Sequence, residues 1–566
     1  MMQKEKIIIY QVLPRLFGNQ VKNPTPNGDL QENGCGKLND FTDKALQQIQ
    51  ALGANYIWYT GVIEHATQTD FSEFGILPDH PAIVKGKAGS PYAIKDYYDI
   101  APALATQVNE RMAEFEDLIK RSHKNGLKVI IDFVPNHVAR QYHSDQQTPG
   151  TIGLGDRDDP SRSFSPYNNF YYIPQAEFNP HFDLNAQGFD RYHEYPAKAT
   201  GNDQFTASPS RIDWYETIKL NYGVDYQNAM AKHFDPIPDT WFKMKDILLF
   251  WAQKGIDAFR CDMVEMVPVD FWEWAIPIVK ENHPHILFIA EAYNPNQYKR
   301  YLYRGQFDYL YDKVGLYDTL KSIIQGHAPA SQITSNWQSL DDLQTRMLNF
   351  LENHDEQRIA SSFFAADPNK AIPAMTISAC LNTCPMMIYF GQEFGESGMN
   401  QEGFSGLDGR TSIFDYWSVD TIRRWYNKGK CNFTKLSDKE INLYEFYKKI
   451  LNIAKTEQAI TQGLFFDLMY VNTRSNNFNP DKQYAFLRKH ENEILFIIVN
   501  FDSETRNIET NIPSHAFEYF KLSPKNRIDS IELLTQKKEV ITFTPERPIR
   551  TQLKPYSSKI LKLIYK

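Results

Sequence analysis

A unit of helix, glycine and apolar strand recurs along this 566-residue chain. In the three clearest copies the helical segment ends at a glycine, which readily adopts the backbone conformation that terminates a helix. A continuous apolar run follows, as expected for a strand that is covered on both faces. Repeated alternation of helix and strand predicts a parallel sheet with helical crossovers. The clearest copies are helices at 39–52, 109–125 and 239–254, the glycines Gly53, Gly126 and Gly255, and strands at 54–59, 127–134 and 256–259.

Further copies of this unit bring the number of predicted strands to about eight. Eight βα units over this length favour an α/β fold closed into a (β/α)8 TIM barrel over an open doubly wound sheet. No Gly-x-Gly-x-x-Gly follows the first strand, which argues against a dinucleotide-binding sheet. The remaining predictions are strands at 7–17, 286–290 and 386–390, weaker strands at 307–311 and 347–351, and helices at 271–280 and 371–381.

Two stretches interrupt the alternation. Residues 138–225, after the third strand, are polar and lack periodicity, which predicts an irregular inserted domain. From about residue 461, strand-like runs at 483–488, 494–500, 541–544 and 559–564 replace helices and predict an all-β C-terminal sandwich. The predicted domains are the barrel at 1–137 and 226–460, the insert at 138–225 and the C-terminal domain at 461–566.

Composition limits the classes of protein that fit. The formal net charge of −8 argues against a nucleic-acid-binding surface as the main purpose. Of the five cysteines only Cys380 and Cys384 lie close in sequence, so we expect neither a disulfide framework nor a zinc site. The first ten residues hold only a three-isoleucine run, which is too short for a signal-peptide core or a membrane span. We therefore expect a cytoplasmic protein that uses no membrane.

Polar residues gather where the predicted strands end. In such a barrel the active site lies at the carboxyl ends of the strands, so residues that follow different strands meet at one rim. Acids scattered at random would fall on both ends of the barrel. The residues at this rim are Asp132, Asn136 and His137 after the third strand, Arg260 and Asp262 on the fourth, Glu291 after the fifth, and His354 and Asp355 after the seventh.

Acids without an obvious metal-ligand set suggest glycoside hydrolysis, which needs one ionised carboxylate and one protonated carboxyl group. Side chains alternate along a strand, so Arg260 and Asp262 share a face, and the guanidinium favours ionised Asp262. Glu291 follows an apolar run and has no basic neighbour in sequence, so we expect its pKa to be raised. From this segment alone, a structural ion pair explains Arg260 and Asp262 equally well.

These residues resemble the signature motifs of the alpha-amylase family of glycoside hydrolases, and the resemblance spans about residues 7–450. Residues 132–137, 255–262, 289–293 and 350–355 resemble the four main motifs, and 9–15, 92–98 and 389–393 match as well. The resemblance implies a retaining hydrolase of α-glucans or maltooligosaccharides that forms a covalent glycosyl-enzyme. It also implies a separation of about 5–5.5 Å between the two catalytic carboxyl groups.

The same resemblance assigns roles to single residues. Asp262 would be the nucleophile, Glu291 the acid/base and Asp355 the stabiliser of the transition state. His137, Arg260 and His354 would contact the sugar that is cleaved, and Tyr92 would stack on its ring. Arg358 either contacts sugar or pairs with a neighbouring acid, Glu352 or Glu356.

The chain departs from the family pattern after the predicted nucleophile. Amylases of the family often carry Lys-His there, whereas this chain has Glu265 and Met266. The change leaves room for an oligosaccharide enzyme or for a transglycosylase (α-glucanotransferase), which would use the same catalytic residues. A non-catalytic carbohydrate-binding relative and a metal-dependent barrel hydrolase are two further functions that such a barrel could have.

No organic cofactor is expected, and the sequence leaves open whether the protein binds calcium. Asn136 either binds Ca²⁺ together with oxygen atoms of the insert, as in many relatives, or caps the turn after the third strand. Asp96 and Glu393 are expected to brace loops near the site. Four tryptophans either stack on sugars or lie in the core, and the core is the role expected for each: Trp58, Trp214, Trp241 and Trp337. The acids considered as further calcium ligands are Asp156, Asp158, Asp159 and Asp183.

Overall fold

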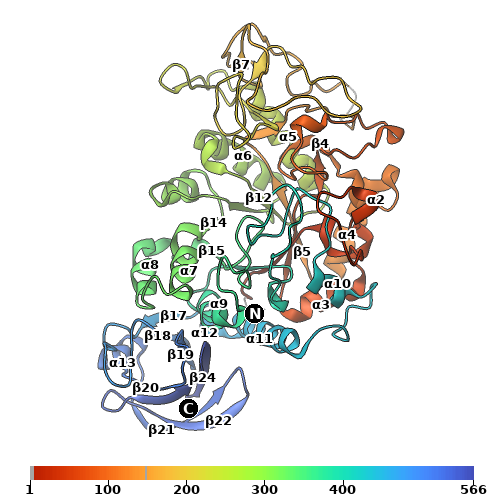
Figure 1. The fold of residues 1–566 in the computed structure, drawn as a ribbon. Coiled ribbons are helices and arrows are strands. Elements are labelled where there is room, and N and C mark those ends of the chain that lie inside the picture. Colours follow the sequence, from red (N-terminus) through yellow and green to blue (C-terminus); the bar gives the residue numbers. More distant parts are fainter. Residues whose placement is uncertain (1–4, 147–149, 566) are drawn as a thin grey trace.

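Eight parallel strands form a closed barrel in the computed structural model, which describes residues 5–146 and 150–565. Each strand pairs in parallel with its neighbours, and the first strand closes the ring on the last. The predicted TIM barrel is therefore confirmed (Figure 1). In barrel order the strands are β1 (Ile8–Val12), β2 (Tyr56–Tyr59), β5 (Lys128–Phe133), β12 (Ala258–Cys261), β13 (Leu287–Ala290), β14 (Tyr309–Tyr311), β15 (Met347–Phe350) and β16 (Met386–Tyr389).

Helices cover the outside of the barrel because their apolar faces pack on the outward side chains of the strands. Gly255 separates α5 from the fourth barrel strand and has a backbone φ of 94°, which glycine adopts at little cost. The helices around the barrel are α3 (Asp43–Leu52), α4 (Arg111–Lys124), α5 (Asp239–Gln253), α6 (Val269–Asn282), α7 (Asp318–Ile324), α8 (Gln332–Leu340), α9 (Ile372–Cys380), α10 (Asp420–Tyr426) and α11 (Asp438–Thr456). The short helix α12 (Gln458–Thr461) packs on strands of the C-terminal domain.

The interior of the barrel is a packed core and not a channel. Its apolar cluster takes one or two inward side chains from each strand, as barrel cores do. Ile9, Trp58, Ile130, Ala258, Ile289, Tyr311, Leu348 and Met387 are members. Above this layer, at the carboxyl ends of the strands, the inward positions become polar.

The first strand is shorter than predicted. It ends at Val12, and Pro14 opens the short helix α1 (Pro14–Phe17). Proline fits the first turn of a helix because its missing N–H has no partner there. The apolar run from 7 to 17 is therefore a strand followed by a helical turn.

The insert leaves the barrel after β5 and contains little regular structure, as expected. Its two-residue strands and the pair β6 (His137–Ala139) and β9 (Thr217–Lys219) organise it. In Figure 1 it lies at one end of the molecule and the C-terminal domain lies at the other. Further short elements here are β7 (Tyr172–Ile173), β8 (Ala197–Lys198), β10 (Val224–Asp225) and β11 (Ala231–Lys232), while β3 (Ile63–His65) and β4 (Ile94–Ile100) form a hairpin after β2.

The C-terminal domain consists of antiparallel strands, which confirms the predicted all-β domain. Six strands form one sheet and two form another, and α13 (Ser514–Phe520) packs with them. The strands are β17 (Leu464–Asp467), β18 (Gln483–His490), β19 (Glu493–Asn500), β24 (Ser557–Ile564), β21 (Lys525–Glu532) and β22 (Lys537–Phe543) in the first sheet, with β20 (Arg506–Thr510) and β23 (Ile549–Leu553) in the second.

Among residues 5–146 and 150–565, no helix combines the length and apolarity that crossing a membrane requires. The cytoplasmic location stays a prediction.

Candidate active site

Backbone pairing in the barrel positions the predicted acids. The amide of Asp262 donates to the carbonyl of Phe133, and the amide of Glu291 donates to the carbonyl of Cys261. Both residues therefore extend the parallel ladder by one position and follow the ends of β12 and β13. Their side chains emerge at the same rim because the strands are parallel and in register.

Arg260 is the cation at the centre of this rim, and its side chain is 1% exposed. One of its Nη atoms lies 2.7 Å from Asp262 Oδ1 and the other lies 2.7 Å from Glu291 Oε1. Asp132 Oδ1 is 3.5 Å away, and Nε donates to the Tyr311 hydroxyl at 3.1 Å. One guanidinium thus serves three carboxylates, which its planar set of several N–H donors makes possible.

This arrangement corrects two expectations for the catalytic pair. Glu291 does have a basic neighbour, because Arg260 lies on the adjacent strand even though it is distant in sequence. Burial, and then the charge of Glu291, raise the pKa of Asp262 well above its ordinary value, and Arg260 only partly offsets this rise. The charge of Glu291 therefore acts directly on the carboxyl group of Asp262.

Glu291 is held by two further donors. The Tyr293 hydroxyl donates to Oε1 at 2.6 Å, and the amide of Met263 donates to Oε2 at 2.9 Å. Glu265, one of the two departures from the family pattern, accepts hydrogen bonds from the amides of Tyr293 and Asn294 at 2.8 and 3.1 Å. Glu265 therefore braces the loop that positions Tyr293.

Asp355 and His354, which follow β15, form another wall of the site. Nε2 of His354 lies 2.9 Å from Asp355 Oδ2 and 2.7 Å from the Tyr92 hydroxyl, and the rings of Tyr92 and His354 stack at 5.2 Å. Partial burial acts to raise the pKa of Asp355, but His354 and then Arg260 outweigh it and hold that pKa below its ordinary value. Asp355 is thus the acid in this group that is favoured as a carboxylate. Arg410 donates to its backbone oxygen at 2.6 Å.

A cavity of about 250 Å³ lies between these walls. Six of the predicted site residues line it: Tyr92, His137, Asp262, Glu291, His354 and Asp355. Burial, and then Lys219 and Lys85, lower the pKa of His137 to about 3, so its imidazole is neutral near pH 7. The cavity therefore presents acids, a neutral donor or acceptor and an aromatic ring to a polar ligand.

Sequence reasoning missed several residues of this cavity. Trp214 was expected in the core, but it lines the cavity with its ring 5.2 Å from that of His137. Lys85 and Glu216 form an ion pair at 2.9 Å in the same wall. These residues lie in irregular segments that carry no periodic signal, so only their distance in space reveals them.

Arg358 does not line this cavity. It is fully buried, it lies 3.0 Å from Glu352 Oε2, and it donates to the Thr411 hydroxyl at 2.9 Å. Pairing with Glu352 is therefore the arrangement found, and the assignment of Arg358 to sugar binding is corrected.

The surroundings of Asn136 do not fit a calcium ion. Its Oδ1 accepts a hydrogen bond from the ammonium of Lys219 at 2.7 Å, and its Nδ2 donates to the carbonyl of Gly201 at 2.7 Å. Lys219 also pairs with Asp203 at 2.6 Å. A side-chain cation thus lies where Asn136 would offer its oxygen to a metal. Asp158 instead accepts hydrogen bonds from the backbone amides of Asn169 and Phe170.

Comparison with known proteins places this site in a family. A family model described as "Alpha amylase, catalytic domain" matches residues 11–469. Alpha-amylase 3 of Dictyoglomus thermophilum is 25% identical over 474 residues, which cover 81% of this chain and 78% of that protein. An alpha-glucosidase of Apis mellifera is 22% identical, over 90% of this chain and 88% of that protein.

A solved structure shows the same fold across the whole chain. The crystal structure of the alpha-amylase from Geobacillus thermoleovorans, complexed with acarbose, superposes with a TM-score of 0.63 at 20% identity, and covers 99% of this chain and 98% of that one. The extent of the family match, together with this fold, means that the chain belongs to the alpha-amylase family.

Proposed function

We propose that the protein is a retaining α-glycoside hydrolase that acts on α-glucans or maltooligosaccharides. The observation that carries the proposal is the pairing of Asp262 and Glu291 with one guanidinium in the lining of one cavity, which Asp355 also lines. Two carboxyl groups on one sugar-sized cavity are the minimum that retaining hydrolysis requires.

In the first step, the carboxylate of Asp262 attacks the anomeric carbon while the Glu291 carboxyl gives its proton to the leaving glycosidic oxygen. The C–O bond to the leaving sugar breaks, and an ester to Asp262 forms. In the second step, Glu291 takes a proton from water, the water attacks the same carbon, and the ester breaks. Two inversions at one carbon give net retention.

The electrostatic coupling of the pair supports these roles. Burial, and then the charge of Glu291, raise the pKa of Asp262, so a proton on Glu291 removes the second of these causes and brings Asp262 closer to the ionised form that Arg260 favours. One proton shared by the pair is the state that the first step needs. Asp355, His354 and Tyr92 all line the cavity, where the two polar side chains would bind sugar hydroxyls and Tyr92 would cover the sugar ring.

A transglycosylase is the second candidate, and Glu265 is the observation that favours it. Where amylases of the family often place a Lys-His pair, Glu265 turns to the loop after β13 and leaves the cavity wall to Met263. Hydrolysis and transfer use the same acids and differ in whether water or a sugar hydroxyl accepts the glycosyl group.

The test is product analysis over time with linear, branched and cyclic α-glucans, with the anomer of the first product followed by NMR. The proposal expects α-anomers at early times, and β-anomers would contradict retention. Longer products than the substrate would identify transfer. On aryl glucosides with good leaving groups, Glu291→Gln should retain the first step, because such groups need no proton.

A further inference from the structure

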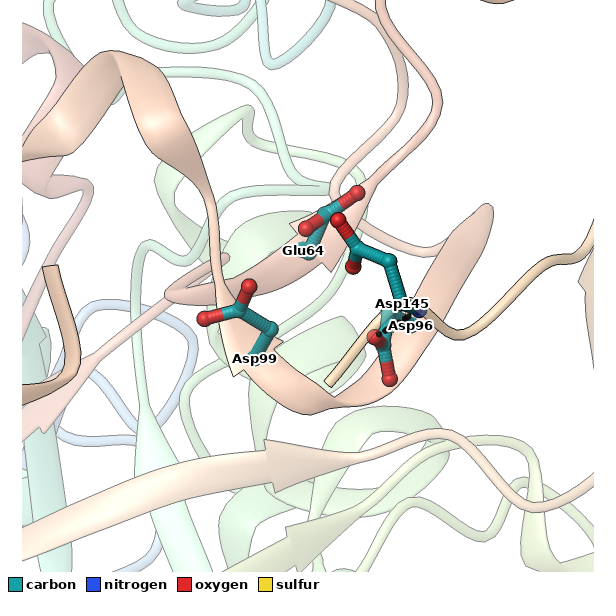
Figure 2. Close-up of side chains that lie close together, drawn as sticks. All are labelled: Glu64, Asp96, Asp99 and Asp145. Atoms are coloured by element: carbon teal, nitrogen blue, oxygen red, sulfur yellow. Dashed lines mark hydrogen bonds between the residues drawn. The ribbon is translucent and has the colours of Figure 1, made fainter. Parts of the chain in front are cut away.

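Four carboxylates outside the catalytic cavity converge at the base of the insert (Figure 2). Glu64 comes from β3, Asp96 and Asp99 come from the neighbouring strand β4, and Asp145 follows β6 near the start of the insert. One oxygen atom from each residue lies within 4.8 Å of the corresponding oxygen of every other. We call these four residues the Glu64 cluster.

Two members of the cluster are firmly held by the chain. Asp96 accepts hydrogen bonds from the Ser144 hydroxyl at 2.7 Å and from the amide of Asp145 at 3.0 Å. Asp99 accepts from the amide of Ile100 at 2.7 Å and from Nε of Arg111 at 2.7 Å. Asp96 therefore braces a loop, as expected from the sequence, and both carboxylates are fixed in position before any ligand arrives.

The other two members lack partners. Glu64 is only 1% exposed, and its Oε2 has no hydrogen-bond partner among the described residues. Oδ1 of Asp145 is likewise buried and unpartnered within that part of the chain. Figure 2 shows the two carboxylates directed toward each other. Buried acceptors that face only acceptors are unfavourable, because neither can donate to the other when both are ionised.

The charge of the cluster is only partly balanced. Arg111 pairs with Asp99, and Lys95, the neighbour of Asp96 in sequence, is already paired with Asp79 at 3.1 Å. Burial, and then Asp99, Asp145 and Asp96, raise the pKa of Glu64 to about 9, which reflects how strongly this site disfavours a further bare negative charge. A proton or a bound cation is needed to relieve the repulsion.

We propose that the Glu64 cluster binds one calcium ion. Oxygen atoms that ligate one Ca²⁺ at 2.3–2.6 Å can be at most about 5 Å apart, and the four oxygens of the cluster meet that limit. Calcium accepts irregular sets of carboxylates, whereas Mg²⁺ requires a near-octahedral set and keeps its water. Asp145 is partly exposed and gives the ion a route from solvent.

The ion would join three segments that the sequence separates. It would tie β3 and β4 to the loop that starts the insert, and β4 begins two residues after Tyr92, which lines the catalytic cavity. Calcium at this position would therefore hold the insert and the Tyr92 segment together. It does not take part in the reaction.

The experiment uses the full-length protein, stripped of metal with EDTA and desalted. Calorimetric titration with CaCl₂ should show about one ion bound per chain, and at a hundredfold excess over the dissociation constant the thermal midpoint should rise by about 2 °C or more. Glu64→Gln should weaken binding at least about tenfold, because it replaces a charged ligand by a neutral one of the same shape.

Two further variants complete the test. Asp145→Asn, at the exposed edge, should weaken binding in the same way, which preserves the test if Glu64→Gln does not fold. Asp183→Asn removes an exposed acid elsewhere in the insert and should bind calcium as the unmodified protein does. The proposal is overturned if the unmodified protein binds no calcium at millimolar concentration, which would mean that a proton alone neutralises Glu64, or if Glu64→Gln and Asp145→Asn both bind it unchanged.

Discussion

The catalytic cavity and the Glu64 cluster both concentrate buried carboxylates, but the chain neutralises them differently. At the cavity, Arg260 lies within 3.5 Å of three carboxylates. At the Glu64 cluster, Arg111 pairs with Asp99 alone, and the four converging side chains are all acids. The base of the insert shows a third case, in which Lys219 serves Asn136 and Asp203.

The two ways of neutralising the acids differ in whether the cation is part of the chain or can dissociate. A guanidinium on a strand cannot leave, so it can hold two reacting acids at fixed positions through every turnover. A bound ion depends on its concentration and stabilises only when present. A permanent cation therefore suits a reaction centre, and a removable ion suits a structural junction. The following predictions test that contrast.

The largest effect is expected at the proposed nucleophile. Asp262→Asn should lower kcat on maltooligosaccharides by about 10⁴-fold, or about 5.5 kcal/mol, because the amide cannot form the covalent intermediate. The unfolding free energy should change by less than about 1 kcal/mol, since Arg260 keeps Glu291 as a partner. Turnover assays and urea unfolding measure both quantities.

Glu64→Gln is the matched control for this variant, because it also turns a buried acid into an amide. It should leave kcat almost unchanged and alter the response to calcium instead. Comparable losses of turnover in the two variants would show that the two acidic regions do not have separate roles.

The second effect concerns the permanent cation. Arg260→Met leaves Asp132, Asp262 and Glu291 without their shared counterion, and should lower the unfolding free energy by about 3–5 kcal/mol. The loss should be the same with calcium and with chelator. Arg111→Met at the Glu64 cluster should be less harmful with calcium than with chelator. Urea unfolding with calcium and with chelator measures both losses. Equal calcium dependence of the two variants would mean that the two acidic regions are not neutralised differently.

The barrel could be predicted from sequence because its signals are local. The glycines that end helices, such as Gly255, and the continuous apolar strands both follow from short-range rules, and the order of barrel strands follows the order of the chain. Pro14 marks the one place where an apolar run contained two elements, and its missing N–H was the available signal.

The site was only partly predictable. Acids at strand ends could be named because strand direction alone brings them to one rim. The contact between Arg260 and Glu291 joins residues that are distant in sequence, and only the pairing of the adjacent strands β12 and β13 brings them together. Trp214 and Arg410 come from irregular segments, whose path no periodicity defines, and Lys219 ends β9, a strand of only three residues within the insert.

A smaller effect is expected for the lysine near Asn136. Lys219→Met removes the donor to Asn136 and the partner of Asp203, and should lower the unfolding free energy by about 2 kcal/mol. Added calcium should not restore it, because too few oxygen ligands surround Asn136. Lys232→Met, which removes a surface pair with Asp270, should change stability by less than about 1 kcal/mol. Recovery of the Lys219 variant by calcium would reveal a latent metal site.

The smallest effect is a pH dependence at His137, which tests whether this buried imidazole stays neutral beside the two lysines. Burial, and then Lys219 and Lys85, lower the pKa of His137 to about 3, against an ordinary value of 6.5. Between these values the unfolded chain binds a proton that the folded chain does not, so the contribution to stability is complete above pH 6.5 and falls as the pH drops toward 3. From pH 6.5 to 5.5 the loss should be roughly 1 kcal/mol.

His137→Gln has no such titration, so its unfolding free energy should fall less than that of the unmodified protein over this interval. Urea unfolding at the two pH values gives the difference, and parallel behaviour of the two proteins would mean that the folded structure does not lower the pKa of His137.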